Sequence, residues 1–375
     1  MANKDIVTLV AVGDVHPPGR EHSEEAFDLT RSILRGADIT FGQLEGNLSN
    51  RGTRQLYTGA AGSRPNNPRG AKILSNAGFN IFSFASNHTM DWSEDAMLDT
   101  IDVMRDNNIV VIGAGKNIKQ ARKPAIIERK GTKVGFLAYC SVVPRGYEAG
   151  EDKSGLAPVR ATTIYRPVDS QQGMVARIIT EAYPDDVAAM VKDIKKLRKS
   201  VDVLVVSMHW GVHFVPSVIA MYQYEVGHAA IDAGADIIIG HHPHILKGIE
   251  VYKGKVIFFS LCNFSMTLTL TELMKDTQNR YLSFYGWEVD PDYPNYAFPI
   301  DSQKTILVKC NIADKKIQRV AFLPCWITKK SQPEPLSRSD PRSDEVYHYM
   351  EWLCRDQRLY DTKFSREGDE IVVLT

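Results

Sequence analysis

Carboxylate, imidazole and amide side chains gather in five short stretches of this 375-residue chain, and each stretch directly follows a run of apolar residues. These side chains are Asp14 and His16, Glu45, Asn87 and His88, His209, and His242 and His244. Imidazoles and carboxylates bind divalent ions such as Mn, Fe, Co or Zn, and an Asn carbonyl is a neutral oxygen ligand. Two ions about 3.5–4 Å apart need a bridging carboxylate and about three further ligands each. The set can supply such a dinuclear site without cysteine.

The apolar runs before these side chains have the length and β-branched composition of strands, and stretches with helical periodicity separate them. We predict strands over residues 6–12, 38–44, 80–85, 109–112, 125–129, 134–140, 203–208, 236–239, 249–252 and 256–260, and helices over residues 23–35, 71–77, 94–107, 184–199 and 221–233. Gly36 and Gly234 occupy the position of a glycine that ends a helix. Because the carboxyl ends of strands in open α/β sheets share one edge, the five stretches should meet in one crevice.

Three long connections interrupt this pattern, at residues 47–69, 141–173 and 263–302, and we expect lids or binding elements there. The third is rich in aromatic residues: Tyr281, Phe284, Tyr285, Trp287, Tyr293, Tyr296 and Phe298. They form either a satellite core or dimer contact, or a wall that faces substrate. Further along, we predict strands near residues 305–311 and 316–322, a helix near 343–355 and a last strand at 370–374. The expected organisation is a catalytic domain, residues 1–330, on which a C-terminal helix and strand, residues 331–375, are packed.

Composition excludes several classes of protein. Lys and Arg number 45, as do Asp and Glu, so the chain lacks the surplus of positive charge that binding to nucleic acid requires. No run approaches the roughly 18 apolar residues of a membrane span, and residues 6–12 lead into Gly13 and Asp14 rather than a signal-peptide cleavage site. Five cysteines without CxxC spacing indicate neither a disulfide framework nor a thiolate zinc site. We therefore expect a cytoplasmic protein without a membrane partner.

The motifs that contain the candidate ligands resemble the CapA (poly-γ-glutamate synthesis protein) family of the calcineurin-like metallophosphoesterase superfamily. The resemblance rests on G-D-V-H at residues 13–16, L-E-G-N-L-S at 44–49, S-N-H-T-M-D at 86–91, H-W-G at 209–211 and G-H-H-P-H at 240–244, and it closes with K-G-I-E-V-Y-K-G-K and F-F-S-L-C-N-F up to residue 264. It implies a four-layer α/β/β/α sandwich with a metal centre at the strand ends.

The resemblance also implies individual roles. Asp14, His16 and His244 would bind the first metal ion, Glu45 would bridge the two ions, and Asn87, His209 and His242 would bind the second. His241 is adjacent and could take the place of His242. His88 would be a general acid or would hold the substrate. Arg64, in the first long connection, matches a position where relatives carry an arginine facing the crevice, and Arg54 and Lys247 are weaker candidates for binding an anion.

The chain differs from the family at two positions. His16 stands where many CapA-type members have Met, which favours a complete dinuclear site. His213 stands where the family often has an acidic residue, and an additional imidazole would suit acid–base chemistry in which two bases exchange a proton.

Three functions agree with these residues. The leading prediction is a hydrolase in which hydroxide on two divalent ions (Mn, Fe, Zn or Co) attacks a phosphoester or an amide or peptide-like bond. The second is a metal-dependent epimerase or lyase, of the CapA-like peptide epimerase type, that exchanges a Cα proton. The third is a non-catalytic protein that binds polymer. We expect an anionic small-molecule or peptide-like substrate. The sequence also allows the protein to be a homo-oligomer.

Overall fold

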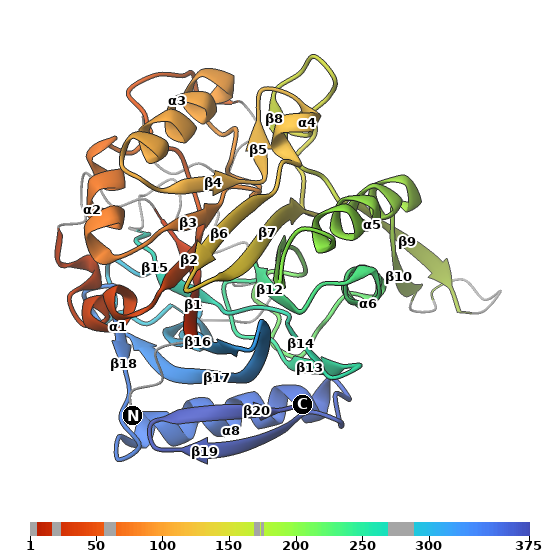
Figure 1. The fold of residues 1–375 in the computed structure, drawn as a ribbon. Coiled ribbons are helices and arrows are strands. Elements are labelled where there is room, and N and C mark those ends of the chain that lie inside the picture. The colour runs from red at the N-terminus through yellow and green to blue at the C-terminus, as the bar shows by residue number, and fades with distance from the viewer. Residues whose placement is uncertain (1–5, 17–23, 56–64, 169–172, 174–175, 269–288) are drawn as a thin grey trace.

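Two β-sheets packed face to face, with helices on both outer faces, build the molecule (Figure 1). The computed structural model describes residues 6–16, 24–55, 65–168, 173, 176–268 and 289–375. One apolar cluster fills the space between the sheets and extends under the helices of the second sheet, and another lies between the first sheet and its helices. This arrangement is the predicted four-layer α/β/β/α sandwich.

The first sheet is mixed and contains the strands that lead to Asp14 and Glu45. Its order is β19-β20-β17-β16-β1-β2-β3-β4, with β15 beside β1 and β18 beside β17. The strands are β1 (Val7–Val15), β2 (Ile39–Leu44), β3 (Ile81–Ser83), β4 (Val110–Ile112), β15 (Asn263–Ser265), β16 (Lys304–Ala313), β17 (Lys316–Ile327), β18 (Pro333–Pro335), β19 (Lys363–Glu367) and β20 (Glu370–Leu374). Because β1 to β4 are parallel, their carboxyl ends share one edge.

The second sheet contains the strands that lead to the candidate histidines, in the order β13-β14-β12-β11-β7-β6. They are β6 (Ala125–Arg129), β7 (Thr132–Cys140), β11 (Val203–His209), β12 (Ile237–His241), β13 (Ile249–Tyr252) and β14 (Lys255–Phe258). Strands β7, β11, β12 and β14 are parallel, so His209 and His241 lie side by side at the carboxyl edge.

The helices separate into two groups on the outer faces (Figure 1). Helices α1 (Arg31–Gly36), α2 (Arg69–Ala77) and α3 (Ser93–Asp106) cover the first sheet, whereas α5 (Pro184–Arg198) and α6 (Met221–Ala233) cover the second, and a short α4 (Ile118–Ala121) lies beside the pair β5 (Ala114–Gly115) and β8 (Gly155–Leu156). Helix α6 ends at Gly234, whose φ of +118° is the left-handed conformation that glycine adopts most easily. The predicted helix end at Gly234 is confirmed.

Strand β1 shows why these residues form a buried strand. Val7, Leu9 and Ala11 belong to the cluster between the sheets, whereas Val10 and Val12 face the helices. Successive side chains of a strand point to opposite faces, so a strand buried on both sides is a continuous apolar run. The apolar run in the sequence therefore indicates a central strand.

Several predicted elements differ from the structure. The helix over residues 23–35 is broken into a 3₁₀ turn (Glu24–Phe27) and α1, and Gly36 is the last helical residue rather than the glycine beyond it. The predicted loop at 141–173 contains β8 and β9 (Ala161–Pro167), which pairs with β10 (Ala176–Ala182) in an exposed hairpin. Periodicity misses this hairpin because most side chains of its two strands are exposed or only partly buried.

The C-terminal segment is continuous with the first sheet. Strand β20 pairs with β17 and β19, and α8 (Pro341–Asp356) contacts β17 and β13 from below in Figure 1. Val346, Met350 and Leu353 of α8 belong to the same apolar cluster as the residues between the sheets. No helix in the described ranges combines the length and apolarity that crossing a membrane would need.

Candidate metal centre

Asp14 is positioned by a close approach of two backbones. Its amide donates to the Cys262 carbonyl at 2.9 Å, and its side chain is inaccessible to solvent. A Cβ on the preceding Gly13 would lie 2.0 Å from that same carbonyl oxygen, so only glycine allows β15 to run this close to β1. The pairing of β1 with β2 is irregular between Ala11 and Asp14. Such an irregularity at a strand end is a common way to redirect a side chain.

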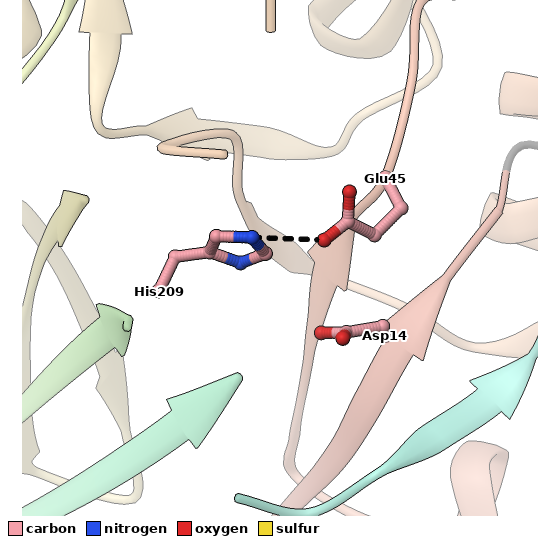
Figure 2. A group of neighbouring side chains, drawn as sticks. All are labelled: Asp14, Glu45 and His209. Atoms are coloured by element: carbon pink, nitrogen blue, oxygen red, sulfur yellow. Dashed lines mark ion pairs between the residues drawn. The ribbon is translucent and has the colours of Figure 1, made fainter. Parts of the chain in front are cut away.

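Glu45 directly follows β2 and points toward the second sheet (Figure 2). Its Oε2 accepts a 2.8 Å hydrogen bond from the Ser86 hydroxyl, and its Oε1 lies 3.1 Å from His209 Nε2. His209 ends β11, so the two residues approach one another from different sheets. Both side chains are almost completely buried.

The three side chains in Figure 2 form a compact group of potential ligands. One ligand atom each of Asp14, Glu45 and His209 lie within 4.8 Å of one another. Among the His, Cys, Asp and Glu side chains of the described residues, these three form the group whose ligand atoms lie close enough together to hold one metal ion. Its members come from three of the five stretches in which the sequence predicts ligands.

Asn87 and His88 lie in the turn after β3, which also holds Ser86 and Thr89. Asn87 Oδ1 is 2.7 Å from His209 Nε2, so Asn87 joins the group. His88 turns differently: its Nδ1 is 2.7 Å from Asp91 Oδ2, and its Nε2 is 3.9 Å from Glu45 Oε2. The adjacent side chains thus diverge, one toward His209 and the other toward Asp91.

The histidines after β12 surround Asp14 through an unusual backbone path. His242 and His244 have φ values of +96° and +55°, a region that is uncommon for residues other than glycine. The His242 amide donates to Asp14 Oδ2 at 3.1 Å, and His244 Nδ1 lies 3.4 Å from the same oxygen. His241 Nδ1 is 3.2 Å from the other oxygen, Asp14 Oδ1. Strained backbone of this kind is typical of functional sites.

The structure separates the surroundings of His241 and His242. The His241 ring ends β12 between the sheets, with its centroid 6.1 Å from that of Phe41. The His242 ring lies among the other histidines, with its centroid 5.0 Å from that of His209 and 3.8 Å from that of His213. His242 lies among the other histidines, and His241 lies beside the Asp14 carboxylate with both ring nitrogens buried and without a hydrogen-bond partner in the described structure. Both stay candidate ligands.

The remaining predicted site residues have different outcomes. His213 joins the group, since its ring centroid is also 5.3 Å from that of His244. His16 directly follows β1, and its Nε2 is 3.5 Å from Asn66 Nδ2 in the first long connection. Arg64 lies outside the described residues. Lys247, a weaker candidate for binding an anion, is only 1% exposed, and its ammonium group donates to backbone carbonyls instead.

The electrostatics of the group suit a bound cation. Burial raises the pKa of Glu45, and the charge of Asp14 adds to this, while the charge of His88 opposes it. Buried side-chain atoms without a hydrogen-bond partner in the described structure include Asp14 Oδ1, Glu45 Oε1, His209 Nδ1 and His242 Nδ1. Two buried carboxylates this close repel one another unless positive charge lies between them. A divalent ion would supply that charge and use these atoms as ligands, so the residues fit a metal.

Burial and neighbouring charges act in opposite directions on the pKa of His88. Burial lowers its pKa, but the hydrogen bond to Asp91 and the charge of Glu45 outweigh burial and raise the pKa to about 9. Asp91 Oδ1 in turn accepts a 3.2 Å hydrogen bond from the Tyr147 hydroxyl. His88 is therefore held by a chain of two hydrogen bonds that begins at the loop after β7.

Sequence reasoning missed the residues that orient the candidate ligands. His244 Nδ1 is 2.7 Å from Asn263 Oδ1, and Asn263 Nδ2 donates to the Tyr296 hydroxyl at 2.8 Å. That hydroxyl donates to the Ser302 carbonyl at 2.7 Å. Asp91 and Asn263 lie in the motifs S-N-H-T-M-D and F-F-S-L-C-N-F, on which the family resemblance rests. Their place in these motifs was the sequence signal that could have identified them.

The described part of the aromatic connection is a satellite core. Tyr293, Tyr296 and Phe298 pack with Met266 and Ile327 in a small apolar cluster of their own. The Phe298 ring centroid lies 5.4 Å from that of His244, so this cluster reaches the candidate site. Tyr281, Phe284, Tyr285 and Trp287 lie outside the described residues.

The chain is similar in sequence to a family of known proteins. A sequence model of the family described as bacterial capsule synthesis protein PGA_cap matches residues 8–267. The PGA biosynthesis protein CapA of Bacillus subtilis (strain 168) is 28% identical over 271 residues, covering 69% of this chain and 63% of that protein. The capsule biosynthesis protein CapA of Bacillus anthracis is 30% identical over 195 residues, covering 52% of this chain and 41% of that protein. The matched region thus spans less than two thirds of either relative.

Two solved structures share a distant likeness. A phosphatase from Mycoplasma pneumoniae superposes with a TM-score of 0.44 at 14% identity, covering 92% of this chain and 99% of that chain. The calcineurin-like phosphoesterase YfkN from Bacillus subtilis gives a TM-score of 0.40 at 12% identity, covering 95% and 98%. The family match is stronger evidence than these two superpositions. Its matched region, residues 8–267, includes every residue that the sequence predicts as a metal ligand. The chain belongs to the bacterial capsule synthesis protein PGA_cap family, the CapA family whose motifs it resembles.

Proposed function

We propose that the protein is a metal-dependent hydrolase that uses two divalent ions, chosen from Mn, Fe, Zn and Co, to cleave a phosphoester or an amide or peptide-like bond. The observation that carries the proposal is the buried convergence of Asp14, Glu45 and His209 from two different sheets. Bound ions would activate water and polarise the group under attack. The chain's own residues would orient the ligands, hold the substrate and move protons.

The ligand roles in this proposal follow the contacts. Glu45 faces His209 through Oε1 and Ser86 through Oε2, so each oxygen is directed to a different side, as a bridging carboxylate requires. Asn87 and His209 share one side of Glu45. Asp14 lies beside His244, whose Nδ1 faces Asn263. A metal-binding histidine commonly donates its other ring N–H to such a partner, which leaves His244 Nε2 as the proposed ligand atom.

His88 is the proposed general acid. Asp91 and Tyr147 hold its ring, and the hydrogen bond to the Asp91 carboxylate favours the protonated form of the imidazole. A protonated imidazole can donate to the leaving group as the bond breaks. The proposed substrate is a small anionic or peptide-like molecule, and Arg64 is proposed to bind its negative charge. The proposal includes a cytoplasmic location, which the five free, buried cysteines support because reducing compartments preserve thiols.

His213 supports a second candidate function, exchange of a Cα proton in an epimerase or lyase. It adds an imidazole whose Nε2 is buried without a hydrogen-bond partner in the described structure, beside the proposed ligand His242. Together with His88, it would provide two groups able to exchange a proton. A binding protein without activity is the third candidate.

One set of assays separates the three functions. The full-length protein, loaded separately with Mn, Fe, Co or Zn, is incubated in heavy water with bis(p-nitrophenyl) phosphate, with γ-glutamyl p-nitroanilide and with γ-linked glutamate peptides. Hydrolysis predicts cleaved product that disappears on chelation. Deuterium in an intact peptide would favour the epimerase instead. Bound metal with neither product would favour the binding protein and contradict the proposed hydrolase.

A further inference from the structure

Lys247 is a buried lysine without a carboxylate partner in the part of the chain that the structure describes. It lies three residues after His244 and is 1% exposed, although lysine is almost never buried this deeply unless it is paired. Burial lowers its pKa, and no charged group of the described chain contributes to the shift. The partners of its ammonium group must therefore be neutral.

These partners are three backbone carbonyls of one segment, residues 213–219, which connects β11 to α6 and is called here the His213 segment. Lys247 Nζ donates to the carbonyl oxygens of Val215, Pro216 and Val218, at 3.1 Å for Pro216 and 2.9 Å for Val218. In its protonated form the amine has three N–H donors, and all three are then used. Gln357, just beyond α8, adds a fourth contact to this segment through its 3.3 Å hydrogen bond to the Pro216 carbonyl.

The His213 segment presses its histidine against the candidate ligands. The His213 ring centroid is 3.8 Å from that of His242, and the next ring, Phe214, has its centroid 5.8 Å from that of His244. Phe214 has a φ of +58°, which is costly for a bulky residue and persists only where the surrounding structure enforces it. The Phe214 amide donates to the Pro243 carbonyl at 3.0 Å, which connects the segment to the turn between His242 and His244.

We propose that Lys247 is a positioning residue that holds the His213 segment so that the His213 ring stays packed against the His242 ring. The inference deepens the proposed function, because it makes the geometry of that site depend on a residue that touches neither substrate nor ion. Without the three donors, the carbonyls of the segment would turn toward water and the strained conformation at Phe214 would relax. His213 would then leave the His242 ring.

The test observes the histidine rings directly. Full-length protein with ¹³C-labelled histidine, loaded with Zn²⁺, is studied by NMR, and His213 is assigned with the variant His213→Gln. Aromatic rings packed this closely shift one another's proton signals, so the native His213 signal should be displaced from that of the exposed His348. Lys247→Met keeps the side-chain length and removes the donors, and it should abolish this displacement. Lys247→Gln keeps two N–H donors and should restore at least part of it.

The controls separate positioning from general destabilisation. Leu74→Ala removes buried apolar atoms of α2 on the opposite face of the first sheet, and it should lower the melting temperature without moving the His213 signal. A Lys247→Met protein that melts earlier but keeps the native His213 signal would overturn the proposal. If Lys247→Met does not fold, Lys247→Leu decides, because it also lacks every donor, and a native His213 signal in that variant would overturn the proposal. Ring packing is measured rather than turnover, so failure of the hydrolase assays would leave this result interpretable.

Discussion

Glu45 is the residue whose charge the two proposed ions share. Glu45→Gln keeps the shape of the side chain and its contact with Ser86, but removes the negative charge that lies between the ions. We expect the metal content after dialysis to fall toward zero at both sites together, because the repulsion between the ions is then uncompensated. Elemental analysis of the dialysed protein measures this directly.

A matched control variant shows whether metal loss depends on the position of the removed carboxylate. Glu250→Gln removes the same charge from β13, where Glu250 pairs with His228 at 2.9 Å away from the candidate ligands. That variant should keep its metal. Two full equivalents of metal in Glu45→Gln would show that Glu45 binds neither ion.

His88 differs from its neighbours because it faces Asp91 rather than His209. We expect His88→Asn to keep the full metal content and to lower kcat by about 10²–10⁴-fold, the usual contribution of a general acid. Metal analysis, kcat and melting temperature are measured on the same preparation. His348→Asn, at an exposed histidine of α8, is the control and should change none of them. Normal turnover in a metal-loaded His88→Asn protein would exclude a catalytic role.

Strand β15 and the 3₁₀ turn Ile300–Gln303 act together as an element that orients one ligand. Asn263 presents Oδ1 to His244 only while its amide nitrogen donates to the Tyr296 hydroxyl. Without that hydroxyl, the amide can rotate and present its N–H₂ group to the ring. The element thus determines which nitrogen of His244 is available to a metal.

Tyr296→Phe removes only the hydroxyl group that accepts the hydrogen bond from Asn263. We expect the affinity of the site that contains His244 to fall by about 10–100-fold, the range found when a partner of a metal ligand is lost. Competition with a chromophoric chelator gives the Kd. Tyr293→Phe, in the same apolar cluster, is the control because its hydroxyl contacts Trp326 instead. Equal affinities in the two variants would contradict the role of Tyr296.

The buried Lys247 affects the stability of the whole molecule and makes that stability depend on pH. Its pKa falls from 10.5 to about 7 in the folded protein because burial disfavours the charged form. Between pH 7 and 10.5 the unfolded chain therefore binds more protons than the folded chain, so this group makes stability rise with pH. Below pH 7 both states are protonated and the contribution is constant.

The variant Lys247→Met lacks this titration. We expect the free energy of unfolding of the native protein, relative to that of the variant, to rise with pH by up to about 1.4 kcal/mol per unit across this window. Urea unfolding at a series of pH values measures the difference, and other titrating groups cancel between the two proteins. A difference that does not change with pH would show that Lys247 titrates at an ordinary pKa in the fold.

The sequence alone determined the strands and the residues at their ends. Apolar runs such as that of β11 are buried on both faces, so they are visible without a structure, and the polar residue that ends the run, His209, is visible for the same reason. The parallel order of α/β strands then predicts the shared edge. The convergence of Asp14, Glu45 and His209 follows from local patterns of this kind, whereas the four layers were implied by the resemblance to the CapA family.

Only the tertiary structure decided what depends on contacts between distant segments. The positive φ values at His242 and His244 separate the surroundings of His241 and His242, and such values cannot be read from G-H-H-P-H. Lys247 has the sequence signature of a surface charge, yet three carbonyls from another segment enclose it. Periodicity records which face of an element is buried, but not which partner covers it. The partners of Lys247, Asn263 and His213 therefore became known only when the two sheets were packed together.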